Sequence, residues 1–416
     1  MIVRQLKQQA GIIRDYFSVI SGSAGRVLIS LAYFVALANT LSIGDFGVFA
    51  TASATGVVLS RLVSFGFVSP LYRIATVKPQ LIGAYTGGYL AAVVLSLPVV
   101  AIAAWAVHAV FFGGDISLLI FALIIVAEAL FWRSAEVIII VNNGLNRFGK
   151  AAILVVFGTV TRAVAAILFA FSAEKDLAHW AWWYLAANGV SLLVALWFYP
   201  RVKLRFAPAL YKRRIADALA VAGAEILFYV QMELDKLLVL SIGGPRIAGI
   251  YAILMRLVDL TALPIRSFNM MLVQRLMRTP DMLRSLKMKV GLEGGIFLVS
   301  IGALAALALF LYFFPGALGS NVAAIVALLP LVILVPGFRN LAEYQAELLY
   351  ARGQSGLRTA NLAILTCAKA LLIYLLFTHF GADDAWVIWL NAIFAALYLL
   401  SLVLTYRGLR LPAKRV

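Results

Sequence analysis

Arginine and lysine recur inside the longest apolar stretches of this 416-residue chain. A charged side chain at the centre of a bilayer costs roughly 2.5–3.5 kcal/mol even on the lenient insertion scale. The planar guanidinium of arginine binds phosphate and carboxylate through two parallel hydrogen bonds. Repeated basic residues at such depth therefore indicate a hydrated cavity that attracts an anion. The candidate anion-binding residues are Arg26, Arg61, Arg162, Arg256, Arg266 and Arg339.

Acidic residues in the same apolar stretches are candidates for ion coupling. A carboxylate in a low-dielectric environment takes up a proton more readily than one in water, so it can act as a proton carrier in transport. Hydrogen bonding between helices is the alternative role for such a group. The candidates are Glu128, Glu136, Glu225, Asp235, Asp259, Glu343 and Glu347.

Ion pairing within the protein is the alternative role of the basic residues. Spacings of three or four residues let an acid and a base meet on one face of a helix, and they occur at Arg133–Glu136, Arg256–Asp259 and Arg339–Glu343. The internal repeat described below places Arg26 opposite Glu225. Arg61, Arg162 and Arg266 have no acid at a helical spacing. Anion binding is therefore favoured most at these three positions.

The elements that carry these residues must be transmembrane helices. Apolar residues make up 64% of the chain and charged residues only 13%, which leaves too little polar surface to cover a soluble protein of this size. Runs of about 20 apolar residues can cross a bilayer, where the backbone must satisfy its own hydrogen bonds as a helix. We predict an all-α integral membrane protein with about twelve spans, at residues 18–40, 46–69, 80–110, 116–141, 150–172, 178–199, 215–242, 246–270, 288–313, 322–349, 358–379 and 385–406.

The distribution of basic residues predicts the orientation of the chain. The termini and every second loop hold 24 of the 35 lysines and arginines, whereas the opposite loops hold two, Lys175 and Arg246. Because basic loops stay in the cytoplasm, we expect both termini to be cytoplasmic. The net charge of +17 is explained by these loops, so we expect no nucleic acid partner.

An internal repeat divides the chain into two halves. LSIG begins at Leu41 and again at Leu240. GVFA (47–50) recurs as GIYA (249–252), GGYLA (87–91) as GGIFL (294–298) and SAEVIII (134–140) as QAELLYA (345–351). These matches keep their order along the chain. They predict two pseudo-symmetric six-helix lobes, residues 1–206 and 207–416, related by an axis along the membrane normal and placed around a central cavity.

Two segments resemble a known family of transporters. Residues 233–268, ELDKLLVLSIGGPRIAGIYAILMRLVDLTALPIRSF, are similar to the seventh and eighth helices of bacterial polysaccharide flippases. Residues 37–73 are similar to their first two. These flippases are the O-antigen and exopolysaccharide members of the multidrug/oligosaccharidyl-lipid/polysaccharide (MOP) exporter superfamily. The resemblance implies that the chain moves a polyprenyl-diphosphate-linked oligosaccharide from the cytoplasmic to the periplasmic leaflet of a bacterial inner membrane. A polysaccharide polymerase and a chain-length regulator are the candidate protein partners.

Two other functions remain open. A multidrug exporter of the same superfamily would carry organic cations and should have a mainly acidic cavity. A membrane enzyme of the polysaccharide pathway would need a sizeable external loop or a soluble domain, and the loops here are short. We expect no cofactor and no metal, because the single cysteine, Cys367, lies in an apolar span and the three histidines fall on different helices.

Overall fold

The structure is a computed structural model that describes residues 25, 28–278, 286–380 and 385–411. Helices account for most of these residues, and the described ranges contain no strand. The first is Leu28–Thr40. It is followed by α2 (Ile43–Leu59), α3 (Val68–Val77), α4 (Ile82–Val107), α5 (Leu118–Ile125), α6 (Arg133–Gly144), α7 (Phe148–Ala170), α8 (Leu177–Trp197), α9 (Pro208–Arg278), α10 (Leu286–Phe313), α11 (Ser320–Ala323), α12 (Val335–Ala351), α13 (Ser355–Phe380) and α14 (Trp386–Gly408).

The predicted all-helical membrane architecture is confirmed. Each of the twelve predicted spans overlaps described helix, and α9 carries two of them because it continues past a break at Gly244, where φ is 78°. Among the described residues, seven helices are long and apolar enough to cross a membrane, or eight if the bent helix that includes α12 is one span. The helices Leu28–Thr40 and α2 are apolar but shorter.

Several spans depart from regular α-helix, and three of these departures lie close to the centre of the molecule or to its charged residues. After α2 the chain turns through Ser64 and Phe65, which have positive φ values of 63° and 47°, before α3 begins. Between α5 and α6 the backbone forms a π-helical turn, Val126–Trp132. The short helix Val326–Val332 meets α12 at an angle of 51°. Such irregularities leave backbone groups and side chains free to face a cavity within the protein.

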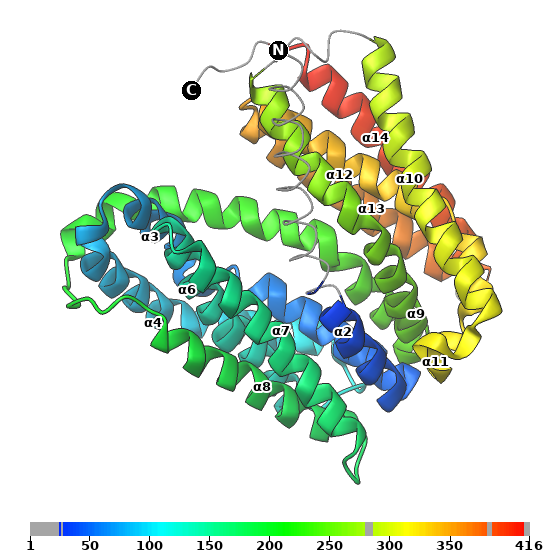
Figure 1. The fold of residues 1–416 in the computed structure, drawn as a ribbon, viewed down its shortest axis with the longest axis horizontal. Helices are drawn as coiled ribbons and strands as arrows, with labels where there is room; N and C mark the ends of the chain where they lie inside the picture. The colour runs from blue at the N-terminus through cyan, green and yellow to red at the C-terminus, as the bar shows by residue number, and fades with distance from the viewer. Residues whose placement is uncertain (1–24, 26–27, 279–285, 381–384, 412–416) are drawn as a thin grey trace, which may run out of the picture.

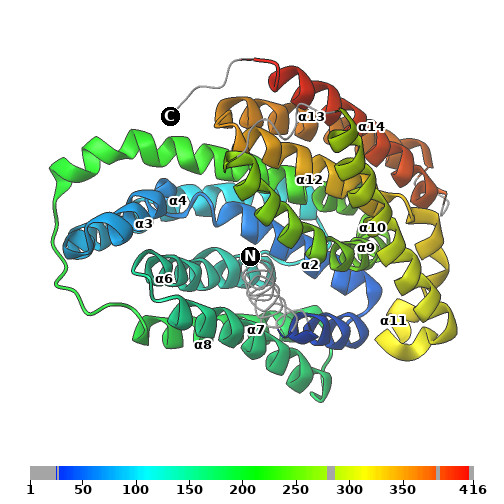
Figure 2. The ribbon, with the colours of Figure 1, turned by 45° about the horizontal axis from the view of Figure 1, so that its top comes forward.

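The helices form two groups that meet at α2 and α9 (Figure 1). One group consists of α3–α8 and the other of α10–α14, and the turned view shows the same division (Figure 2). The link between α8 and α9 contains the predicted boundary of the two lobes, at residues 206 and 207. The start of α9 also packs on the first group, because Gly66 lies against the backbone of Ala218.

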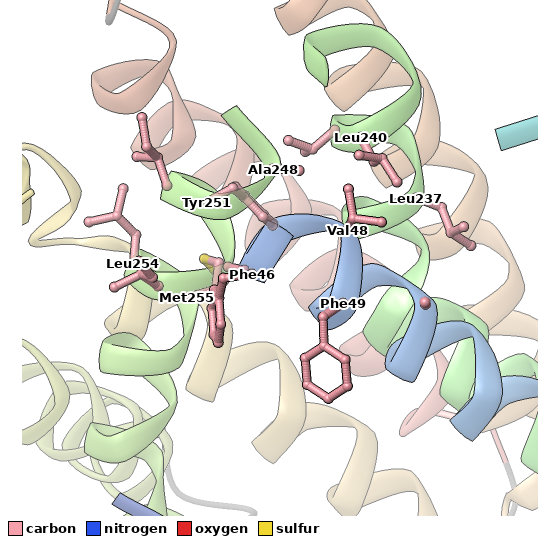
Figure 3. Close-up of a cluster of buried hydrophobic side chains, with 14 of the residues drawn as sticks. Phe46, Val48, Phe49, Leu237, Leu240, Ala248, Tyr251, Leu254 and Met255 are labelled. Atoms are coloured by element: carbon pink, nitrogen blue, oxygen red, sulfur yellow. The ribbon is translucent and has the colours of Figure 1, made fainter. Parts of the chain in front are cut away.

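The core of the contact between the groups is formed by α2 and both parts of α9 (Figure 3). Phe46, Val48 and Phe49 of α2 are buried together with Leu237 and Tyr251 of α9. Burial of such apolar side chains excludes water and lipid from this seam and fixes α2 against α9.

Glycine allows the two backbones to approach closely at this seam. A Cβ atom on Gly47 would collide with the backbone of Gly249, Pro245 and Ala248, and one on Gly249 would collide with the carbonyl of Ile43. These glycines belong to GVFA and GIYA, so the two copies of the repeated motif pack against each other. Small residues at such a crossing are typical of helix pairs in membranes.

Candidate functional site

Two adjoining cavities contain most of the charged residues that the sequence singled out. The first has a volume of about 480 Å³ and lies where Leu28–Thr40, α2, the π-helical turn, α7 and α8 face α9. The second has a volume of about 790 Å³ and lies between α9 and α12–α14. Glu233, Arg256 and Asp259 of α9 line both cavities. Helix α9 therefore forms a wall shared by the two groups of helices.

Glu136 belongs to an ion-pair network that links the turn after α2, α6 and α9. Its carboxylate lies 3.1 Å from Arg61 and 2.7 Å from Arg133. Arg133 is 2% exposed and also lies 3.3 Å from Glu225 at the start of α9. The Arg61 guanidinium stacks over the ring of Tyr229, 4.1 Å from its centroid. Two arginines and two glutamates thus neutralise one another, and Arg61 lines neither of the two cavities.

A second ion-pair network joins α9 to α12. Arg266 donates two hydrogen bonds to Glu343, from Nε at 3.1 Å and from a terminal nitrogen at 3.0 Å. Arg339 lies 3.0 Å from Asp259, and Arg266 lies 3.7 Å from the same carboxylate. All four side chains line the second cavity. Their charges balance, so this wall offers hydrogen-bonding groups without net charge.

Of the three local ion pairs that the spacing allows, one is present among the described residues. Arg133–Glu136 is confirmed, but Arg256 does not pair with Asp259 and Arg339 does not pair with Glu343. Of the three arginines that lacked a local acid, Arg61 and Arg266 are paired with acids from other helices, whereas Arg162 is not. Spacing along one helix allows contact but does not require it, and a carboxylate on a neighbouring helix can reach the guanidinium with better geometry.

Three further pairs neutralise the remaining lysines and one arginine of this region. Lys369 is buried 3.1 Å from Asp235, which also accepts a hydrogen bond from Tyr251. The pairs Lys236–Glu233 and Arg358–Glu347 line the cavities, the second at 2.7 Å. Asp235 and Glu347, predicted as coupling residues, are thus held by cations.

Arg162 and Arg256 differ from the other arginines of the site. Both line the first cavity, and within the described ranges neither has a carboxylate oxygen within 4.0 Å. Arg162 bonds the carbonyl of Gly158 at 3.3 Å and stacks 4.0 Å over the ring of Trp132. Arg256 donates to Ser30 Oγ at 2.6 Å. Two guanidinium groups therefore face one cavity without a carboxylate within 4.0 Å, although Glu128, Glu233 and Asp259 also line that cavity.

Glu128 is the carboxylate of this cavity that has no cationic partner among the described residues. It is 3% exposed and lies in the π-helical turn. Its Oε1 accepts hydrogen bonds from Ser53 Oγ at 2.7 Å and from the Tyr184 hydroxyl. Both partners are uncharged hydroxyl groups. The site can therefore hold the carboxyl group without another ion.

Arg26 lies outside the described residues, so its predicted contact with Glu225 is not seen. Glu225 contacts Arg133 instead. Sequence reasoning did not find Ser30, Ser53, Tyr184 or Trp132 as partners of the cavity charges. The sequence carried no signal for them, because polar and aromatic residues are frequent in such helices. These four also contact residues that are remote in the sequence.

One exposed group could hold a metal ion. The ligand atoms of Glu174, Asp176 and His179 lie within 4.8 Å of one another. His179 contacts Glu174 at 2.9 Å and Asp176 at 2.8 Å, and Asp176 also caps α8 by accepting from the His179 amide. Backbone hydrogen bonding at this cap holds the pKa of the Asp176 carboxyl below its usual value. The cap and the histidine contacts account for the arrangement without a metal.

Solved structures share this arrangement of helices. An inward-facing MATE-family multidrug resistance transporter of the MOP superfamily aligns with a TM-score of 0.65 and 14% identity over 92% of this chain and 93% of that chain. The chain has the fold of the MOP-superfamily transporters. The MATE multidrug transporter DinF-BH aligns at 0.62 and 15% identity, over 94% of each chain.

A third match is a MOP superfamily transporter from Pyrococcus furiosus, at a TM-score of 0.59 and 14% identity over 93% of this chain and 92% of that chain. Its description states that the reverse polarity of its binding pocket suggests a different function. No family model and no curated protein matches the sequence. The fold and the apolar helices make this chain a multi-pass membrane protein.

Proposed function

We propose that the protein is a flippase that moves a polyprenyl-diphosphate-linked oligosaccharide from the cytoplasmic to the periplasmic leaflet of a bacterial inner membrane. The observation that carries the proposal is the pair Arg162 and Arg256, which face one cavity without a carboxylate partner. An arginine in that position is costly unless an anion joins it. Diphosphate fits, because guanidinium groups bind phosphate oxygens in pairs.

The remaining walls suit the sugar part of such a substrate. The second cavity presents the ion pairs of Arg266, Arg339 and Arg358, which can exchange hydrogen bonds with neutral hydroxyl groups. Since these charges are already balanced, they add little net attraction for an anion. We therefore assign anion binding to Arg162 and Arg256. We assign to Arg61, Arg266 and Arg339 the role of holding neighbouring helices in position through their ion pairs.

Export of organic cations is the second candidate function. The observation that favours it is Glu128, a buried carboxylate without a cationic partner in the described part of the chain, which lines the same cavity as Tyr33 and Trp132. Carboxylates and aromatic faces together attract organic cations. The two unpaired arginines of that cavity repel them, so we rank this function second.

Transport by purified protein in liposomes separates the two functions. A fluorescent polyprenyl-diphosphate oligosaccharide should become accessible to a membrane-impermeant quencher faster with protein than without it, whereas the organic cation ethidium should not be transported. Arg162→Ala and Arg256→Ala should each weaken binding of the lipid-linked sugar roughly ten- to a hundredfold, as expected for a lost charged hydrogen bond.

Arg73→Ala is the matched control, because Arg73 pairs with Asp217 on the exposed surface at 3.4 Å. It should transport at the wild-type rate. Transport of ethidium with no movement of the lipid-linked sugar would instead identify a cation exporter. Wild-type sugar transport by the double variant Arg162→Ala/Arg256→Ala would remove these arginines from the mechanism.

A further inference from the structure

A third cavity lies apart from the two central ones, where the start of α7 meets the end of α8. Its volume is about 660 Å³. The lining residues are Arg147, Lys150, Leu193, Val194, Trp197, Phe198, Tyr199, Pro200 and Arg201. None of them lines either central cavity. Ion pairing and substrate binding at the centre of the molecule therefore leave this cavity unexplained.

The charged part of this cavity is entirely basic. Arg147, Lys150 and Arg201 are exposed, and the lining contains no acidic residue. Within the described ranges, none of the three has a carboxylate partner within 4.0 Å. Arg73, which is also exposed, has such a partner in Asp217. Three uncompensated positive charges around one hollow attract an anion with several oxygens.

The other part of this cavity is apolar and faces outward. Trp197 is 87% exposed and Leu193 is 69% exposed, and the neighbouring Phe148 is 62% exposed. In a multi-pass membrane protein such side chains contact lipid, and tryptophan is enriched at the level of the head groups. The cavity thus combines a cationic end with an apolar wall at the boundary of the membrane.

We propose that this cavity binds an anionic phospholipid of the leaflet that borders the basic loops. Arg147, Lys150 and Arg201 would hold the phosphate of the head group, and an acyl chain would lie along Leu193 and Trp197. Basic pockets at the ends of transmembrane helices recognise anionic head groups in this way. By the distribution of basic residues, this is the cytoplasmic leaflet.

Lipid binding to the purified full-length protein tests the proposal. Native mass spectrometry in detergent would measure binding of phosphatidylglycerol, with phosphatidylcholine as the zwitterionic comparison. The variant Arg147→Gln/Lys150→Gln/Arg201→Gln should lose affinity for phosphatidylglycerol at least roughly tenfold, since each basic residue near the surface contributes to attraction of anionic lipid. Trp197→Ala should weaken both lipids to a similar degree, because it removes only acyl-chain contact.

The matched control is Lys212→Gln/Arg213→Gln/Arg214→Gln, which removes three exposed charges at the start of α9. It should bind phosphatidylglycerol nearly as the wild type does. Equal loss in both triple variants would overturn the proposal in favour of diffuse attraction. Displacement of phosphatidylglycerol by equimolar polyprenyl diphosphate or by inorganic phosphate would overturn it as well, since the occupant would then be substrate or free anion.

Discussion

Glu128 has hydrogen-bond partners unlike those of the other buried acids. Glu136, Asp235 and Asp259 each lie beside a basic side chain. Glu128 is held by the hydroxyl groups of Ser53 and Tyr184. A hydroxyl can accept as well as donate a hydrogen bond, so both the charged and the protonated carboxyl can be satisfied there. Among the predicted coupling residues, Glu128 is therefore the one we test as the coupling group, because it has no cationic partner among the described residues.

We predict that Glu128→Gln inserts and folds normally but abolishes the dependence of transport on a proton gradient. The amide oxygen of glutamine can still accept both hydrogen bonds, so the packing of Ser53 and Tyr184 should persist. Transport into liposomes with and without an imposed pH gradient gives the measurement. Glu347→Gln is the comparison. Because Glu347 already pairs with Arg358, its variant should retain the response to the gradient.

An unchanged response of Glu128→Gln to the pH gradient would exclude Glu128 as the coupling group. Loss of the protein from the membrane would instead assign Glu128 a structural role.

At the scale of helices, the two predicted halves contain similar ion pairs, although the repeat aligns Glu136 with Glu347 and not with Glu343. Arg61, in the second predicted span, pairs with Glu136 in the fourth, and Arg266 in the eighth pairs with Glu343 in the tenth. Each half therefore joins its second and fourth spans by an arginine–glutamate pair. Such a pair holds the helices of one half together, which suits rigid rocking of one half against the other.

We predict that Gly47→Ala destabilises the protein by about 1–3 kcal/mol, as overpacking does. The added methyl group would collide with the backbone of Gly249, which cannot move aside as a flexible side chain would. Gly295→Ala is the control, because a Cβ there has open space around it. Thermal unfolding in detergent should show a lower midpoint for Gly47→Ala than for the control. Equal midpoints would mean that α2 and α9 can move apart to accept the methyl group without a loss of stability.

For the whole molecule, the twelve predicted spans give an even number of crossings. Together with the 24 to 2 distribution of basic residues, this number predicts that both ends of the chain lie on one side. The basic surface includes the three positions of the proposed phospholipid site, Arg147, Lys150 and Arg201.

We predict that both termini are cytoplasmic. A reporter enzyme that is active only in the periplasm should be silent when fused after Val416, and a reporter that folds only in the cytoplasm should be active there. The same two reporters placed after Lys175, in one of the two opposite loops, should give the reverse result. Periplasmic activity after Val416 would mean that the orientation, or the number of spans, is wrong.

The helices and their class follow from composition and from runs of apolar residues. The bilayer demands a closed set of backbone hydrogen bonds, and helix is the local solution to that demand. The positions where the helices depart from regular α-helix could not be predicted from the sequence. Ser64 and Phe65 adopt positive φ although neither is glycine, and Glu128 lies in a π-helical turn that no local spacing indicated.

The sequence by itself determined that this chain forms apolar helices, and it predicts that the basic loops share one side and that two halves repeat one pattern. Those properties depend on neighbours along the chain or on each residue's affinity for lipid and water. Only the tertiary structure decided which acid meets each base: Asp259 meets Arg339 rather than Arg256. Coulombic attraction acts through space, so the packing of α9 against α12 selected the partners. That selection left Arg162 and Arg256 facing one cavity without a carboxylate partner among the described residues.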